Sequence, residues 1–283
     1  MPSHAQLIAF LAPDWAESHY PQVAQAAARK LRGAGYTLLA ANTESDAAVE
    51  RQALELLLEC RYVAGLIVAS CRSEGGEAIF ESLASQRLPL VLLERQLPGV
   101  RAAFVGWDDE AIGAAATEHL ISRGCRHIAH LRGPCHSSGQ GRFYGYAAAL
   151  ARAGLKVCPG YVVEAGDGSE SGYRAMKQLL AASPRVDGVV CYNDAIAVGA
   201  VKAVLEAGLE IPYDLEVIGA GNLHYTDVLR VPLSTVELNA AQAGEHAARL
   251  LLRALAGGPE QEPERVLVPF EVIPRESSRA VAI

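Results

Sequence analysis

The segment Val189-Val190-Cys191-Tyr192-Asn193-Asp194 carries the strongest structural signal in this chain. Its apolar residues predict a buried strand, and the polar pair after them predicts the start of a helix over residues 195–207. A second apolar strand follows at Val217-Ile218-Gly219. Asn193 is therefore expected at the carboxyl edge of a parallel sheet, where open α/β folds bind ligands.

The same rhythm of short strands and helices runs through most of the chain. Apolar runs predict strands at residues 7–11, 37–41, 65–69, 90–93, 127–131, 161–164 and 188–191. Helical spacing predicts helices at residues 22–31, 47–60, 76–85, 143–153, 170–182, 195–207 and 240–256. Because such alternation is typical of right-handed βαβ units, we expect an α/β fold whose parallel sheets are covered on both faces.

The composition indicates a globular protein. The chain has 283 residues, of which 51% are hydrophobic and 20% charged, which suits one large domain or two of ordinary size. No apolar run approaches the roughly 18–20 residues that cross a bilayer, and no export signal is visible at the start. Six cysteines without a Cys-x-x-Cys motif indicate buried thiols in a reducing cytosol rather than disulfides or a zinc site. We expect a cytoplasmic protein with no metal and no membrane partner.

Charge and motifs argue against DNA contact by this chain alone and against catalysis. The formal net charge of -7 leaves no electrostatic footprint for nucleic acid. The sequence has no His-Glu-x-x-His, Gly-x-Ser-x-Gly or Walker motif, and residues 219–224 lack the third glycine of a dinucleotide fingerprint. Asp108-Asp109 is interpreted as a helix cap rather than a general acid. We expect no catalytic residue and no cofactor.

Several segments in order along the chain resemble the effector-binding domain of LacI-family transcriptional regulators, which shares its fold with type I periplasmic sugar-binding proteins. The segments that carry this resemblance are Val105-Gly106-Trp107-Asp108-Asp109, Gly133-Pro134 with Arg142 and Gly145, the strand–helix–strand unit around Asn193-Asp194, Pro232-Leu233-Ser234-Thr235-Val236, and Ile273-Pro274-Arg275-Glu276-Ser277-Ser278. They cover nearly all of the chain.

The resemblance implies two Rossmann-like subdomains, three crossover segments between them, and a ligand in the cleft that closes by hinge motion. We expect an N-terminal subdomain from residues 1–132 and 238–262 and a C-terminal subdomain from residues 133–237 and 263–283. Residues 132–141, which are rich in glycine and short polar residues, are interpreted as the first crossover and hinge.

The first candidate binding residues are Trp15, His19 and Tyr20, at a place where the family has a polar residue and a pair of aromatics. Their rings can stack on a sugar or a nucleobase, or they can pack against the next helix. Ser70 follows the third predicted strand, and Glu94-Arg95 follows the fourth. All three are expected at the same rim, although Arg95 can also serve only to pair with Glu94.

The second group consists of Arg142, Asn193 and Asn222. Arg142 matches an arginine that hydrogen-bonds ligand oxygens in many family members, and a guanidinium addresses two such atoms at once. Asn193 offers a donor and an acceptor to vicinal hydroxyls, or caps its helix. Asn222 stands where sugar-binding members commonly carry an aspartate, and Leu238 stands where a glutamine is common. Losing a carboxylate while keeping Arg95 and Arg142 motivates the hypothesis of an anionic or phosphorylated effector.

We therefore interpret the chain as the ligand-sensing and dimerisation core of a LacI-like regulator that binds a sugar, a sugar derivative or an anionic metabolite. The resemblance implies a homodimer, and operator DNA would be bound only through an N-terminal helix-turn-helix that these residues lack, either because it was removed or because it was never present. The alternatives are a periplasmic sugar-binding protein of a transporter and an enzyme on the same scaffold. The effector, the sign of the response and the operator are not encoded in any motif.

Overall fold

The computed structural model describes residues 6–72, 79–80, 82–83, 88–182, 185–257 and 262–278. The chain forms two compact units, which we call unit 1 (Met1–Trp107 and Asn239–Val268) and unit 2 (Asp108–Leu238 and Pro269–Ile283). The chain passes between the units three times, as the family resemblance implied. The helix expected over residues 76–85 falls largely outside the described residues.

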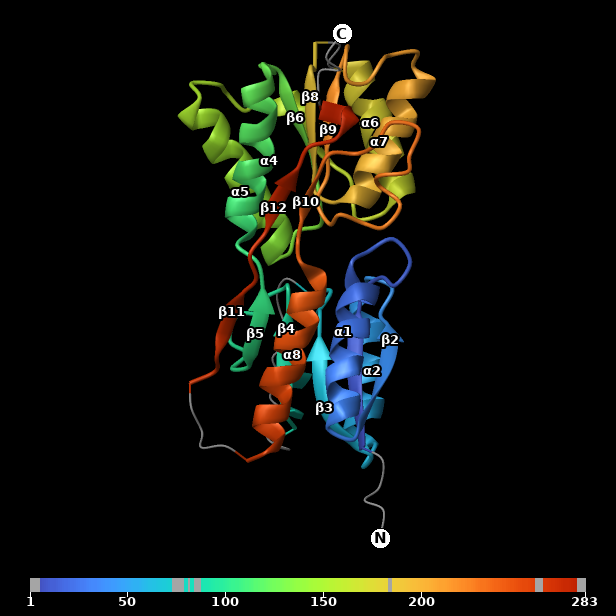
Figure 1. Cartoon of the computed structure of the whole chain (residues 1–283), viewed down its shortest axis with the longest axis vertical. Coiled ribbons are helices and arrows are strands. Elements are labelled where there is room, and N and C mark those ends of the chain that lie inside the picture. The colour runs from blue at the N-terminus through green and yellow to red at the C-terminus, as the bar shows by residue number, and fades with distance from the viewer. Residues whose placement is uncertain are drawn as a thin grey trace. The chain divides into compact units, whose positions relative to one another are not determined.

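Unit 1 contains a six-stranded parallel sheet in the order β11-β5-β4-β3-β1-β2 (Figure 1). Its strands are β1 (Gln6–Ala12), β2 (Tyr36–Asn42), β3 (Val63–Val68), β4 (Leu90–Leu93), β5 (Ala103–Gly106) and β11 (Arg265–Leu267). Its helices are α1 (Tyr20–Gly33), α2 (Ala47–Glu59) and α8 (Ala240–Leu255). Helix α8 packs closely on α1, since a Cβ atom at Gly244 would collide with the Val23 carbonyl oxygen. Leu54 of α2 packs on the other face, against Ala9 and Leu11.

Unit 2 repeats this design with a parallel sheet in the order β7-β6-β8-β9. Its strands are β6 (Ile128–Arg132), β7 (Val162–Glu164), β8 (Gly188–Cys191) and β9 (Glu216–Ile218), and an antiparallel pair joins β10 (Thr235–Glu237) to β12 (Glu271–Ile273). Its helices are α4 (Asp109–Arg123), α5 (Ser137–Arg152), α6 (Ser169–Ala182) and α7 (Asp194–Glu206). The expected α/β class with two parallel sheets is confirmed.

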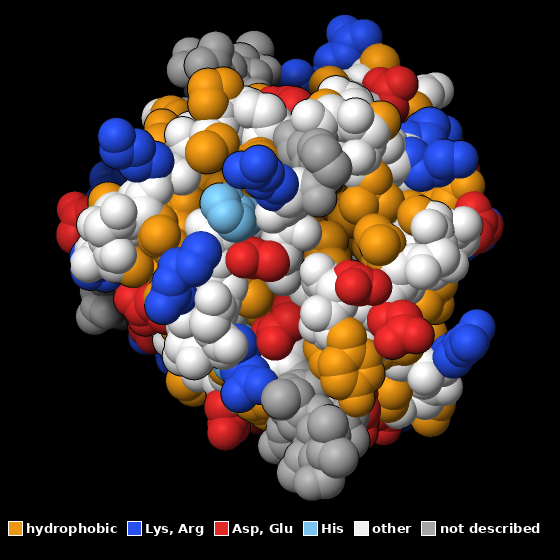
Figure 2. Space-filling model, turned by 90° about the horizontal axis from the view of Figure 1, so that it is seen from above, with side chains coloured by type: hydrophobic (Ala, Val, Ile, Leu, Met, Phe, Trp, Pro, Cys, Tyr) orange, Lys and Arg blue, Asp and Glu red, His pale blue; other side chains and the backbone are white. Residues whose placement is uncertain are grey.

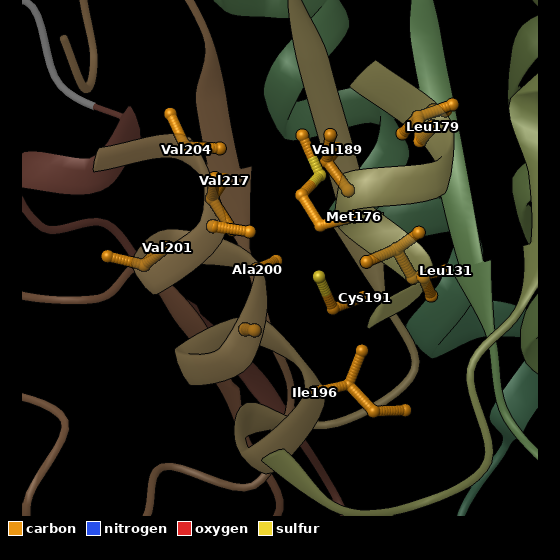
Figure 3. Close-up of a cluster of buried hydrophobic side chains, with 14 of the residues drawn as sticks. Leu131, Met176, Leu179, Val189, Cys191, Ile196, Ala200, Val201, Val204 and Val217 are labelled. Carbon is orange, nitrogen blue, oxygen red and sulfur yellow. The ribbon is translucent and has the colours of Figure 1, made fainter. Parts of the chain in front are cut away.

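One core of unit 2 lies between its sheet and the helices α6 and α7. Figure 3 shows Met176 and Leu179 of α6 and Ile196 of α7 converging on the strand residues Leu131 and Val189. All five side chains are fully buried, and burial of this kind contributes roughly 1.5–3 kcal/mol per large apolar side chain. This core fixes the positions at which β6 and β8 end, and with them the polar residues that follow.

The boundary expected at residue 132 is wrong, because the first passage between units occurs at Trp107 and Asp108. Residues 108–132 belong to unit 2, where β6 pairs with β7 and β8 and α4 packs on α5. The third passage falls at Val268 and Pro269, later than the expected residue 262.

The glycine-rich stretch 132–141 is not a crossover but the turn that starts α5. Its glycines permit close packing rather than hinge motion: a Cβ atom at Gly133 would collide with the Tyr192 ring, and one at Gly139 with the Pro134 carbonyl oxygen. Glycine was therefore misread as a sign of flexibility, and α5 starts at Ser137 rather than at the expected residue 143.

The cysteines are all free, and only Cys125 and Cys191 are buried. Cys135 and Cys158 are exposed, so the expectation of buried thiols is wrong for these two. Of the helices in the described part of the chain, none is long and apolar enough to cross a membrane.

Candidate functional site

The carboxyl edge of the unit 1 sheet gathers aromatic and charged side chains from strands far apart in sequence. The Tyr20 hydroxyl donates to Glu94 Oε2 at 2.5 Å, and His19 Nε2 lies 3.3 Å from the same oxygen. Glu94 adopts a left-handed backbone, with φ of 61°, and its side chain reaches Tyr20, the first residue of α1. The sheet order explains this meeting, because β3 alone separates β4 from β1.

The His19 ring also meets Trp107 edge-on, with ring centroids 5.2 Å apart. Trp107 was not predicted as a site residue. Like Asn193, however, it directly follows a buried strand, in this case β5. His19, Tyr20, Glu94 and Trp107 thus form one cluster, which we call the aromatic cluster, in which His19 and Tyr20 contact the carboxylate and Trp107 contacts His19. Tyr20, Glu94 and Trp107 are buried and His19 is half-buried, so His19 is the member of the cluster whose ring can stack on a flat ligand face.

Trp15 takes the packing alternative. Its indole Nε1 donates to the Ala41 carbonyl oxygen at 3.0 Å, and its ring lies edge-on to Phe10 at 5.1 Å. These contacts join the loop after β1 to the end of β2.

Ser70 faces a buried carboxylate that the sequence interpretation missed. Glu50, in the first turn of α2, accepts hydrogen bonds from Ser70 Oγ at 2.8 Å, from the Cys71 backbone N–H at 2.7 Å and from Arg72 Nε at 3.2 Å. Arg95 is also buried, and its guanidinium donates to the Ser70 carbonyl oxygen at 3.1 Å. Burial, followed by the nearby Glu50 charge, raises the pKa of Cys71 to about 12, so this thiol is not a nucleophile at neutral pH.

Arg142 is buried in unit 2 by contacts within the protein. Its Nε donates to Asp109 Oδ1 at 3.0 Å, one terminal nitrogen donates to the Tyr192 carbonyl oxygen at 2.6 Å, and the guanidinium lies 4.7 Å from the centre of the Tyr192 ring. Asp108 caps α4 as expected, because its side chain accepts from the Ala111 N–H. The neighbouring Asp109 does not cap the helix but forms the ion pair with Arg142.

Asn193 takes its capping alternative. Its Oδ1 accepts from the Ile196 N–H at 2.8 Å and its Nδ2 donates to the Asp167 carbonyl oxygen at 2.8 Å, so both ends of the amide have partners inside unit 2. The next residue, Asp194, is fully buried and was missed as a site residue. It accepts from Thr235 Oγ1 at 2.6 Å and from the Leu223 N–H at 2.9 Å, and these bonds join the start of α7 to β10 and to the loop after β9.

Asn222 lies at the centre of a hydrogen-bonded chain. Arg275 donates to its Oδ1 at 2.6 Å, and its Nδ2 donates to Glu237 Oε2 at 2.7 Å. Neither Arg275 nor Glu237 was predicted as a site residue from the sequence. Asn222 lies 53 residues from Arg275 and 15 residues from Glu237, so no local pattern links them. The carboxylate that position 222 lacks is present after all, on β10. Leu238, at the position where the family commonly has a glutamine, is buried.

Comparison with known proteins agrees with this fold. Residues 117–278 match the model of the periplasmic binding protein-like domain, which defines the class of the protein. The chain is 31% identical over 280 residues to the HTH-type transcriptional repressor PurR of Escherichia fergusonii, covering 97% of this chain and 80% of PurR. It is 28% identical over 274 residues to the ribose operon repressor of Halalkalibacterium halodurans, covering 96% and 80% of the two chains.

Among solved structures, a LacI family transcriptional regulator from Mycobacterium smegmatis matches with a TM-score of 0.84 and 28% identity, over 95% of this chain and 98% of that chain. The chain belongs to the LacI family of transcriptional regulators. It is the effector-binding core of such a regulator, and the relatives do not favour the alternative of a transporter component.

Proposed function

We propose that the chain senses a small effector through the aromatic cluster of unit 1. The observation that carries this proposal is the meeting of His19 and Tyr20 at the Glu94 carboxylate, with Trp107 edge-on to His19, at the carboxyl edge of the sheet. Parallel α/β sheets bind ligands at that edge, and the half-buried His19 ring, held between Trp107 and the Glu94 carboxylate, suits a ring-shaped ligand. Ser70 and Arg95 hold the neighbouring backbone in place.

We infer that the chain regulates transcription and is not an enzyme. Its repressor relatives support this. With a formal net charge of -7, and with acidic and basic side chains interspersed over the face in Figure 2, the chain has little attraction for phosphates. Operator contact would thus be made by a separate helix-turn-helix segment, in the cytoplasm.

We also propose that the chain forms a homodimer. Leu39 on β2, Leu56 on α2 and Tyr62 just before β3 are exposed in unit 1, and β2 is an edge strand of its sheet. Exposed apolar side chains beside a sheet edge favour burial against another copy. Sedimentation velocity at micromolar concentration should give twice the mass of one chain, and a single-chain mass would contradict the dimer.

The effector site is tested by ligand binding to the purified chain. Both tryptophans of the sequence, Trp15 and Trp107, lie near the carboxyl edge of unit 1, so their fluorescence reports on this region. In a thermal-shift panel of sugars, sugar phosphates, sugar acids, nucleobases and nucleosides, we expect selective stabilisation by one class. A ligand at a hundred times its Kd adds about 2.7 kcal/mol.

His19→Ala should weaken that ligand by roughly tenfold, because it removes one ring of the aromatic cluster, whereas His246→Ala on α8 serves as the matched control. No stabilisation by any class, or equal affinity in His19→Ala and the native chain, would overturn the assignment.

A further inference from the structure

Glu50, in the first turn of α2, carries a fully buried carboxylate. We propose that Glu50 is a positioning residue of the effector sensor, which acts on the aromatic cluster through the loop after β3 and through Arg95. This inference rests on the proposed function, because the aromatic cluster is the part of the chain that senses the effector.

Both oxygens of the Glu50 carboxylate bind the segment that follows β3. Oε1 accepts from the Ser70 hydroxyl at 2.8 Å and from Arg72 Nε at 3.2 Å, and Oε2 accepts from the Cys71 backbone N–H at 2.7 Å. Arg72 supplies the counter-charge, and the first turn of a helix favours a carboxylate. Three consecutive residues are therefore tied to one buried group.

Arg95 carries this constraint from the end of β3 to the end of β4. Its buried guanidinium donates to the Ser70 carbonyl oxygen at 3.1 Å, so it binds the residue whose hydroxyl Glu50 holds. Strands β3 and β4 are parallel neighbours in the sheet, so the segments that follow them leave the same edge. Fixing Ser70 therefore fixes the partner of Arg95.

Arg95 also closes the strained turn that presents Glu94. Its backbone N–H donates to the Leu93 carbonyl oxygen at 2.6 Å, and Glu94 lies between them in the left-handed region. Such three-residue turns are rare, and their strain persists only where the surrounding structure holds them. The Glu94 N–H is held by the Val105 carbonyl oxygen at 2.8 Å, and the Arg95 guanidinium is held by Ser70.

The place of the Glu94 carboxylate depends on this turn. The carboxylate accepts from the Tyr20 hydroxyl and lies 3.3 Å from His19 Nε2, so a relaxed turn would move it away from both side chains. The His19 ring would then be free to rotate against Trp107. Loss of the Glu50 charge should therefore weaken effector binding from a distance.

Two variants of the full chain test this relay. Glu50→Gln keeps the size of the side chain but exchanges one acceptor oxygen for a donor, so one donor of the loop loses its acceptor. Ser70→Ala is milder, because it removes only the hydroxyl that binds Glu50. The controls lie on α2: Glu55→Gln is the same change at an exposed position, and Leu54→Ala lowers stability by removing a buried apolar side chain from the core.

Fluorine NMR and calorimetry give two readouts that a purely structural role would not change. With fluorotryptophan in place of both tryptophans, Trp107 reports on the aromatic cluster and Trp15 on the end of β2. The variant Trp15→Phe assigns the two signals. Affinities are measured for ribose, glucose, adenine and adenosine, and urea unfolding gives the stability of each variant.

We expect Glu50→Gln to broaden or split the Trp107 signal and to weaken the tightest probe about tenfold, with smaller effects of the same kind in Ser70→Ala. Leu54→Ala should lose stability, yet it and Glu55→Gln should keep the native Trp107 signal and affinity. A native signal or a native affinity in both folded test variants would overturn the inference. If the native chain binds none of the four probes, the proposed function fails, and the Trp107 signal still decides whether Glu50 positions the cluster.

Discussion

Arg142→Ala is expected to destabilise unit 2 by about 3–5 kcal/mol, the usual cost of removing one partner from a buried ion pair. The Arg142 and Asp109 side chains are only 3% and 11% exposed. Without the guanidinium, the Asp109 carboxylate loses its counter-charge and the Tyr192 carbonyl loses a donor inside the protein. Urea unfolding followed by far-UV circular dichroism measures the loss.

The same pair of helices provides a matched control. Arg152 and Glu118 join α5 to α4 with a 2.7 Å contact, but their side chains are 57% and 54% exposed. Because water already solvates both groups, Arg152→Ala should cost at most about 1 kcal/mol. Equal losses from Arg142→Ala and Arg152→Ala would show that burial does not govern the Arg142 pair.

A double variant separates the two reasons for the loss. Arg142→Ala/Asp109→Ala removes both charges, so no carboxylate is left buried alone. It should recover part of the stability that Arg142→Ala loses, since the buried carboxylate without a counter-charge causes most of that loss. A double variant that loses the sum of both single effects would assign the cost to packing instead.

The sequence predicted the elements of this fold because local patterns determine them. The apolar run at residues 188–191 predicts a buried strand without reference to the rest of the chain. Both β8 and α7 lie within one residue of their expected bounds. Asp108 capped its helix as expected, because a cap depends on the next few residues alone. The family resemblance added the two units and the number of passages between them.

The partners of the site residues were not predictable, since they depend on sheet order and on close approach of helices. Arg142 was expected to contact a ligand, and the structure adds a partner that the sequence did not indicate, Asp109, 33 residues away in sequence. That approach requires glycine at the contact between α4 and α5, where a Cβ atom at Gly145 would collide with the Glu110 carbonyl oxygen. No local pattern distinguishes such a packing glycine from a turn glycine.

Acidification should reveal a buried neutral histidine in unit 2. His130 on β6 is fully buried, its Nδ1 donates to the Val190 carbonyl oxygen at 3.0 Å, and its ring stacks on Tyr146 at 5.0 Å. Burial is the main cause that lowers the pKa of His130 from 6.5 to about 4, and the charges of Arg132 and Arg142 lower it further. The folded state binds fewer protons than the unfolded state between these values, so this stabilising contribution is present above pH 6.5 and is lost toward pH 4.

Replacing His130 by phenylalanine keeps an aromatic ring and removes the titration. At neutral pH, His130→Phe should be less stable than the native chain by about 1 kcal/mol, the net value of the lost hydrogen bond. Between about pH 7 and pH 4.5 the difference should shift by roughly 2–3 kcal/mol in favour of the variant. Urea unfolding at a series of pH values measures this shift, with His224→Gln, an exposed change, as the control.

The stability of the native chain must be measured over the same pH range, because the titration of Asp194 changes stability in the direction opposite to that of His130. Burial raises the pKa of Asp194 from 3.8 to about 6, so its folded state binds more protons and its contribution is lost as the pH rises through 6. In the native chain the two slopes largely cancel between about pH 4 and pH 6. His130→Phe should therefore gain stability on acidification, and Asp194→Asn should lose it. A constant difference between His130→Phe and the native chain at all pH values would show that His130 is charged or solvated in the folded state.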